Sequence, residues 1–305
     1  MSTKVAPAAC VPMKKTLNAA NTSPNNIPNN APIRIPISEP MTSDKSLLDL
    51  CSGLNFARER DRSVIEAVKS LIPEDVRRRD SRGNTALIAL VANGRRVNRS
   101  KMEIAKCLIP YEAGLCNDSG WTALMVVAAN YRFLVNAAER HRLIELVTLL
   151  APHEAGCYEG NGYTALMLLL KKEYSYGFPI AELADILKPY EAGLRHIPTG
   201  ATALHLHWIN ESTTDIFDIL ADKEGSIVDK EFETPLHKAI ASMYYTAINN
   251  PLTPEIIHSL ITLYPSMTTT TGLTPLMIDA ICNNPLKSSH IERYGGIQDL
   301  SLIHI

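Results

Sequence analysis

The 305-residue sequence lacks the features that mark membrane-spanning, secreted and metal-stabilised proteins. No uninterrupted apolar run approaches the roughly 18 residues of a membrane helix, so we expect no membrane span. The N-terminal stretch contains no apolar core of the kind that a signal peptide needs. None of the six cysteines forms a CxxC pair or a zinc-like cluster, which favours reduced thiols and no metal; they stand at positions 10, 51, 107, 116, 157 and 282. These absences predict a cytoplasmic protein, with the nucleus as an alternative.

The sequence also has little net charge and little glycine. Lys and Arg total 30 against 32 Asp and Glu, and a net charge of −2 gives no general attraction to nucleic acid or to an anionic membrane. Only 15 glycines stand against 19 prolines. This ratio suits helices separated by turns better than a sheet-rich fold, and the 46% apolar content is enough for a hydrophobic core.

Sequence signatures of catalysis are missing as well. We find no GxSxG, GxxxxGK[ST] or HExxH motif and no kinase-type glycine-rich loop. We therefore expect no catalytic residue, no cofactor and no small-molecule substrate. The alternative, an enzyme whose site is dispersed along the sequence, requires a cleft that holds a titratable group with a perturbed pKa.

Residues 1–42 differ in composition from the rest of the chain. They are rich in Asn and Pro, and such a segment has few side chains to bury and cannot form regular backbone hydrogen bonds. We predict a disordered, extended tail, with a short partner-docking peptide as the alternative. Its prolines recur at every fourth residue: Pro24, Pro28, Pro32, Pro36 and Pro40.

From residue 43 onward a Thr-Ala/Pro-Leu motif repeats. Two residues before each Thr stands a glycine, except before Thr234, where Phe232 takes its place. Each Thr opens one apolar run, and a second run with apolar residues three and four apart follows most of them, which predicts pairs of helices. The repeated threonines are Thr85, Thr122, Thr164, Thr202, Thr234 and Thr274.

A second phrase recurs after the later apolar runs. It reads PYEAGL at 110–115, PHEAG at 152–156 and PYEAGL again at 189–194. We expect the proline to stop the second helix and the glycine to close the segment and let the chain swing into the next turn. We also expect the glutamate of this phrase to lie near solvent.

These motifs resemble those of the ankyrin-repeat family over roughly residues 43–305. The segments TALHLH at 202–207 and TPLHKAI at 234–240 match the family motif best, and the EAG endings resemble large ankyrin families of parasitic protists. The resemblance implies an all-α solenoid of about seven stacked repeats, the first and last atypical. In it Gly enables the turn, Thr caps the first helix, and His205 and His237 bond turn backbone.

The resemblance also implies a protein–protein interaction scaffold or adaptor without catalytic activity. The residue directly before each Thr lies near the tip of a turn, and we predict partner contacts there from Trp121, Tyr163, Asn84 and Glu233. Contacts are also expected from the exposed side of the first helix in the central repeats. For the two aromatic residues, packing against the neighbouring turn is the alternative. A regulatory or targeting subunit that docks its partner through the Pro-rich tail is the alternative function.

Three further segments carry expectations. A basic zone from Arg77 to Lys101 is predicted to form two solvated clusters on opposite edges, with an acidic protein partner, nucleic acid or nuclear import as alternatives. The variable junctions at 130–142 and 171–179 are expected to lengthen a helix or to form projecting loops. Residues 46–76 lack the Thr motif and are expected to form an N-terminal cap.

Overall fold

The computed structural model describes the greater part of the repeat region. The described residues are 46–53, 62–94, 96–130, 136–171, 178–207 and 213–239. The predicted tail (1–42), Thr274 and the C-terminal segment from residue 240 onward lie outside them, so the full count of seven repeats stays a prediction.

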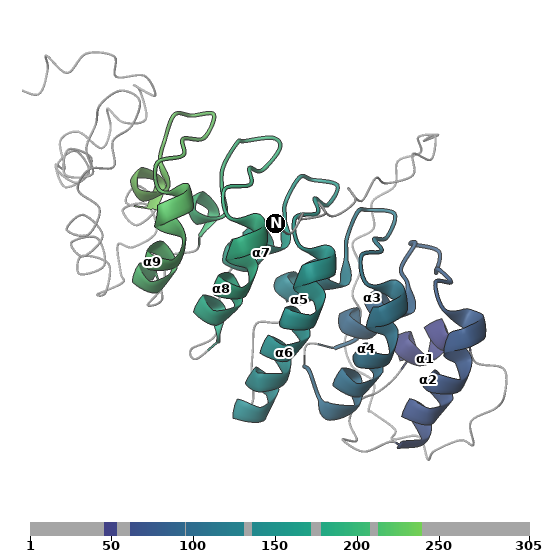
Figure 1. The fold of residues 1–305 in the computed structure, drawn as a ribbon. Helices are drawn as coiled ribbons and strands as arrows, with labels where there is room; N and C mark the ends of the chain where they lie inside the picture. The colour runs from purple at the N-terminus through teal and green to yellow at the C-terminus, as the bar shows by residue number, and fades with distance from the viewer. Residues whose placement is uncertain are drawn as a thin grey trace, which may run out of the picture.

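Every regular element in the described part of the chain is a helix, as predicted. The first helices of the five described pairs form one row: α1 (Leu47–Gly53), α3 (Ala86–Ala92), α5 (Ala123–Asn130), α7 (Ala165–Leu170) and the 3₁₀ turn η1 (Leu204–Leu206). The second helices form another row: α2 (Arg62–Asp75), α4 (Arg99–Glu112), α6 (Ala137–Glu154), α8 (Ile180–Glu191) and α9 (Thr213–Glu224). Within each row, consecutive helices pack side by side (Figure 1). A sixth repeat begins at Thr234 and is described as far as Ala239.

The two rows bury their side chains in different ways. Helix α5 is apolar all round, and Ala123 through Ala129 are all buried because α3, α6 and α7 pack around it. Helix α4 is amphipathic instead: Ile104 and Leu108 are buried, while Glu103 and Lys106 face solvent. Each pair is therefore covered chiefly by its neighbours along the stack, as expected of a solenoid.

The variable junction adds length to one helix. Helix α6 has 18 residues against 12 in α8, so the insertion after Thr122 lengthens the second helix of that repeat. The parts of the junctions at 131–135 and 172–177 lie outside the described residues.

The predicted role of the repeated prolines is wrong. Pro110, Pro152 and Pro189 lie inside α4, α6 and α8, and each helix continues for two more residues to a glutamate. The glycines that follow do close the segments, because Gly114, Gly156 and Gly193 have φ values of 86°, 87° and 88°.

One buried histidine breaks the apolar pattern of the first helices. His207 stands five residues after its Thr, where the earlier repeats have buried Leu90, Val127 and Leu169. Its two ring nitrogens are buried and make no hydrogen bond of ordinary geometry with the described residues. Burial lowers the pKa of His207 to about 4, against the weaker opposing effect of the Leu170 backbone.

Replacing His207 with leucine is expected to raise the free energy of unfolding by about 1–2 kcal/mol, because an unpaired buried polar ring gives way to the side chain of the other repeats. Urea denaturation at neutral pH measures this change. A destabilised H207L variant would show that the imidazole makes a stabilising contact.

Candidate protein-interaction surface

Five turns link the repeats along one edge of the molecule, visible as the raised loops of Figure 1. In turn 1, Asp80 Oδ1 accepts the backbone N–H groups of Arg82 (2.7 Å) and Asn84 (2.8 Å). Asp229 in turn 5 accepts the equivalent N–H groups of its own turn. The side chain that opens the turn thereby fixes its shape. The turns are turn 1 (80–84), turn 2 (117–121), turn 3 (159–163), turn 4 (196–201) and turn 5 (229–233).

Backbone hydrogen bonds tie each turn to the next. The bonds run from Asp118 N–H to Arg82 O (3.1 Å), Gly160 N–H to Ser119 O (2.8 Å), Ile197 N–H to Gly162 O (3.4 Å) and Lys230 N–H to Thr199 O (2.9 Å). This approach requires the predicted turn glycines. Gly83 and Gly162 have positive φ, and a Cβ at either position would collide with the following turn. The five turns therefore form one continuous, ordered edge.

A buried glutamate that recurs in the repeats attaches the turns to the helices. The prediction that the glutamate of the PYEAGL phrase lies near solvent is therefore wrong. Glu154 is 1% exposed; its Oε2 accepts the N–H of Leu124 (2.6 Å) and its Oε1 accepts that of Gly114 (3.2 Å). The first donor opens α5 in the same repeat, and the second closes the preceding repeat. Glu112, Glu191 and Glu224 make the same two kinds of bond, with Arg77, Gly156 and Gly193 as the closing residues.

These carboxylates share the capping of the first helix with the predicted threonines. The Thr122 side-chain oxygen accepts the N–H of Met125 at 3.3 Å, and its hydroxyl donates to Glu154. Burial nevertheless raises the pKa of Glu154 to about 7, against the lowering effect of these hydrogen bonds. Burial likewise raises the pKa of Glu191 and of Glu224.

The two predicted aromatic anchors are half-buried on adjacent turns. Trp121 packs against the hydrophobic core. The Tyr163 ring stacks on the His196 ring of the next turn, with centroids 4.0 Å apart, and the ammonium group of Lys171 lies 4.0 Å from the centroid of the tyrosine. Tyr163 thus packs against the neighbouring turn, as the alternative interpretation states, while partner binding by either residue stays a prediction.

The other two predicted contact residues also serve the turns. Asn84 donates to Asp80 (2.9 Å) and accepts from Asn117 of the next turn (2.9 Å). The backbone carbonyl of Glu233 accepts from His205 Nε2 at 2.9 Å. The Thr202 N–H donates to the other ring nitrogen of His205, which fixes the neutral tautomer and confirms the structural role predicted for this histidine. Its pKa is lowered, first by burial.

The expected exposed side of the first helices is not found in the central repeats. Residues Ala86–Val91, Ala123–Ala129 and Ala165–Leu170 are all buried, because their neighbours in both rows enclose them. The accessible side chains in this part of the molecule therefore lie on the turns and at the far ends of the first helices, such as Ala92, Asn130 and Lys171.

The described members of the basic zone lie in two places, at turn 1 (Arg77, Arg78, Arg79 and Arg82) and at the start of α4 (Arg96, Arg99 and Lys101), whereas Arg95 lies outside the described residues; one member is buried. Lys101 is 1% exposed and donates to the carbonyl of Asn93 at the end of α3 (2.6 Å), so it is no solvated cation. Burial lowers its pKa to about 7, and Glu139 of the next repeat opposes that shift. Near turn 1, Arg79 bridges the carbonyls of Gly83 and Cys116.

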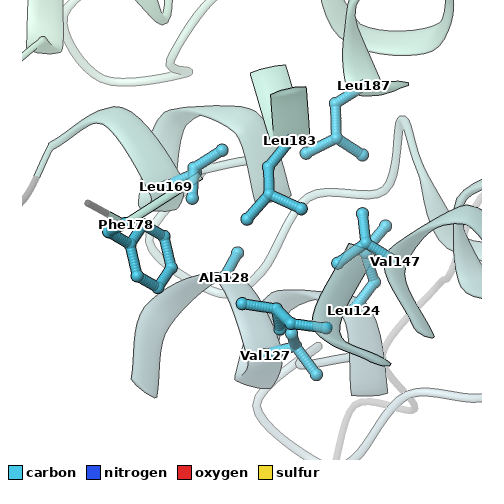
Figure 2. Close-up of a pocket in the computed structure, with 9 residues that line it drawn as sticks. Leu124, Val127, Ala128, Val147, Leu169, Phe178, Leu183 and Leu187 are labelled. Carbon is cyan, nitrogen blue, oxygen red and sulfur yellow. The ribbon is translucent and has the colours of Figure 1, made fainter. Parts of the chain in front are cut away.

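A small pocket between the third and fourth repeats is wholly apolar. Figure 2 shows leucine, valine, alanine and phenylalanine side chains converging from α5, α6, α7, α8 and the segment before α8. It holds no titratable or nucleophilic group, so it offers no chemistry of the kind that a dispersed active site would require. Its lining residues are Leu124, Val127, Ala128, Leu143, Val147, Leu169, Phe178, Leu183 and Leu187.

An acidic cluster lies at turn 5 in the described part of the chain. The carboxylates of Asp229, Glu231 and Glu233 gather closely enough to hold a cation, but Lys238 Nζ contacts all three, at 2.8, 3.2 and 3.8 Å. This ammonium group supplies the positive charge there. No disulfide joins the described cysteines, and Cys51, Cys116 and Cys157 are buried. No described helix is both long and apolar enough to cross a bilayer.

Comparison with solved structures identifies the class of fold. The chain is similar to the ankyrin repeat domain of Bcl-3, a member of the IκB protein family, at 16% identity and a TM-score of 0.53, over 78% of this chain and 95% of that one. It is also similar to EF0377, an ankyrin repeat protein (20% identity, 66% and 92% covered, TM-score 0.47). A third match is to the complex of the Bdellovibrio bacteriovorus predatory endopeptidase Bd0816 with the immunity protein Bd3460. The identity is 21% and the TM-score 0.44, over 67% of this chain and 95% of that one. No family model matches the chain. The search of curated proteins also returned no match.

The fold is therefore an all-α ankyrin-repeat solenoid, as the repeated motifs predicted. At this level of identity the likeness establishes the fold alone.

Proposed function

We propose that this protein is a non-catalytic protein–protein interaction scaffold or adaptor that binds its partner along the edge formed by the five turns. The single observation that supports this most strongly is the ladder of backbone hydrogen bonds between consecutive turns. It presents the tip side chains on an ordered surface, so little ordering entropy is lost when a partner binds.

Within a turn, some residues stabilise the fold and others are exposed, and this separation supports the same proposal. The opening side chain, the glycine and the Thr serve the fold through hydrogen bonds and backbone conformation. The tip residues in between, such as Arg82, Ser119 and Asn161, are exposed. Among the predicted contact residues, Trp121 and Tyr163 combine partial exposure with large apolar area, which is typical of binding hot spots. Asn84 and Glu233 flank them at the equivalent positions.

The alternative assigns partner binding to the Pro-rich tail at 1–42, with the repeats holding a second protein. We also propose that the protein is located in the cytoplasm or the nucleus and is related to the ankyrin-repeat families of parasitic protists. Its partners are proteins, and we propose no membrane, nucleic acid or small-molecule ligand. The fold itself does not determine these features.

Deleting residues 1–42 separates the two functions. If the repeats bind, the truncated chain and the full chain should recover the same proteins in affinity purification with mass spectrometry. The double variant W121A/Y163A in the full chain should recover those proteins at least about tenfold less well, as expected for the loss of two aromatic anchors. Loss of the partners on truncation, with W121A/Y163A unaffected, would assign binding to the tail and contradict the proposal.

A further inference from the structure

Three arginine side chains gather where the second helices of the second and third repeats begin. Arg96 is exposed directly before α4, and Arg99 is exposed as the first residue of that helix. From α6, Arg142 Nε donates to the carbonyl of Val97 at 2.8 Å. Because Val97 directly follows Arg96, this bond places a third guanidinium group beside the exposed pair. These three residues are the junction arginines.

The junction arginines are remote from the edge formed by the turns. Helices α4 and α6 begin on the side of the molecule that faces away from the raised loops (Figure 1). Helix α4 has 14 residues, so at 1.5 Å per residue its start lies about 20 Å from the end that leads into turn 2. A protein bound to the turns therefore leaves this place accessible.

The exposed carboxylate of α4 interacts with lysines. Glu103 stands one helical turn after Arg99, but the two side chains form no ion pair. The pKa of Lys106 is raised first by its pair with Glu145, with a smaller contribution from Glu103. Glu66 likewise raises the pKa of Lys69 most, and Glu103 contributes there as well. The charge of Glu103 is thus shared by two lysines.

Two further carboxylates at this end of the repeats have cations of their own. Glu139 is buried and acts on the buried Lys101, where it opposes the larger effect of burial on the lysine pKa. Glu182 of α8 pairs with Arg140. None of the junction arginines pairs with a carboxylate of the described residues. Residues 96–103, 136–142 and 182 together hold five lysines and arginines against three carboxylates, which leaves an excess of positive charge.

The segment that carries Arg96 is held at two points. Lys101 Nζ donates to the carbonyls of Asn93 (2.6 Å) and Gly94 (3.2 Å) on one side of it. The bond from α6 to the Val97 carbonyl holds the other side. Little ordering of this backbone is therefore needed when a partner binds, which lowers the entropy lost on association.

An acidic protein segment fits the junction arginines better than a nucleic acid does. Guanidinium groups bind carboxylates and phosphates alike, so the choice depends on the surroundings. A nucleic acid spreads its charge over many phosphates, and the chain as a whole carries a net charge of −2. Exposed Asp185 and Asp215 on the neighbouring second helices would repel such a polyanion, whereas a short acidic segment needs only the junction.

We infer that the junction arginines bind an acidic segment of a partner protein, on a surface separate from the turns. Arg96 and Arg99 donate to carboxylates of that segment, and Arg142 adds a third positive charge from the next repeat. A scaffold with two such surfaces can hold two proteins at once. The inference goes beyond the proposed function, and either one can fail without the other.

The probe is a peptide from a phage-displayed random library selected on the full 305-residue chain. The selected clones should include a group enriched in Asp and Glu. A synthetic peptide from the most abundant acidic clone, measured by fluorescence anisotropy, should bind R96E/R99E at least about tenfold more weakly than wild type. Neither side chain forms an ion pair, so the variant should keep the wild-type midpoint of thermal unfolding.

The double variant K188E/K223E is the matched control. Lys188 and Lys223 lie at the surface of α8 and α9, and reversing them changes the net charge by the same amount. This variant and W121A/Y163A should both bind the acidic peptide as tightly as wild type. The affinity of the wild type should fall as the salt concentration rises, because the arginines are accessible to solvent.

Three results would overturn the inference: selection without acidic clones, an acidic peptide that binds R96E/R99E as tightly as wild type, or equal weakening in R96E/R99E and K188E/K223E. The last result reports overall charge only. A labelled single-stranded oligonucleotide that binds wild type but not R96E/R99E, with no acidic clone selected, would assign the arginines to nucleic acid instead. The proposed function is tested separately, since its partners are lost on W121A/Y163A and not on R96E/R99E.

Discussion

Replacing Gly83 with alanine is expected to lower the free energy of unfolding by about 3 kcal/mol, combining the left-handed backbone penalty with overpacking. The φ of Gly83 is 77°, and an alanine Cβ would lie 2.7 Å from the backbone nitrogen of Asp118 in the next turn. That nitrogen belongs to a backbone group that donates to Arg82 O, so relief of the collision breaks the bond between turns 1 and 2. Chemical denaturation of the purified variant measures the change.

Gly94→Ala is the control for backbone conformation. Gly94 has a φ of 75°, almost the same as Gly83, but a Cβ there would meet no atom within 4 Å. This variant should lower the free energy of unfolding by only about 1–2 kcal/mol, the penalty for alanine in the left-handed backbone conformation. If G83A and G94A lowered the free energy of unfolding equally, turns 1 and 2 would not be packed closely enough for an added Cβ to collide.

Replacing Glu154 with alanine is expected to lower the free energy of unfolding by about 3–4 kcal/mol, since two backbone donors and a hydroxyl lose their common acceptor. The buried N–H of Leu124 and the half-buried N–H of Gly114 belong to different repeats, so the variant uncouples them as well as uncapping α5. Urea denaturation followed by circular dichroism tests this.

Glu145→Ala is the matched control in the same helix. Glu145 pairs with Lys106 at 2.7 Å on the surface, and its side chain is 35% exposed. Its loss should change the free energy of unfolding by less than about 1 kcal/mol. If E145A lowered the free energy of unfolding as much as E154A, the hydrogen bonds of the buried carboxylate would not be what holds the turns in place.

The raised pKa of Glu154 adds a pH dependence to this prediction. A pKa of about 7 in the folded chain, against 4.5 for the free side chain, means that the folded state binds the proton more tightly. This contribution to stability is complete below pH 4.5 and is lost as the pH rises through 7. The stability advantage of wild type over E154Q should therefore shrink between about pH 5 and pH 8, because glutamine does not titrate.

The repeated sequence motifs predicted most of the fold. The Thr and Gly positions, the alternation of apolar runs and the structural role of His205 follow from local rules of capping, backbone conformation and helical periodicity. These rules act within a few residues of chain, so a single sequence is enough to apply them.

The features that sequence reasoning missed depend on distant partners. The glutamate of PYEAGL reads as a surface residue because glutamate rarely lies buried, yet Glu112 meets donors 25 and 35 residues away. One signal was available: the carboxylate recurs ten residues before Thr85, Thr122, Thr164 and Thr234, and eleven before Thr202. A solvated position has no reason to keep one residue type in every repeat, whereas a shared acceptor does. Lys101 was missed for a different reason: its acceptors are near in sequence but belong to the end of the preceding helix α3, so the contact depends on how the two helices pack.

The candidate surface was predicted only in outline. The position before each Thr identified the edge of the turns, but Asn84 and Tyr163 proved to be linked to neighbouring turns. The exposed side chains of Ile197 and Phe232 were not predicted, although the departure from glycine at Phe232 was visible in the sequence. Its meaning required the φ value and the exposed side chain.

Hydrogen–deuterium exchange of the full chain, with and without a bound partner protein, tests most directly whether the edge of turns is the binding surface. We expect the partner to slow exchange at amides of turns 1 to 5, most strongly in turns 2 to 5, and to leave the outer helices α2, α4, α6 and α8 unchanged. Protection confined to those outer helices, or to residues 1–42, would contradict this assignment.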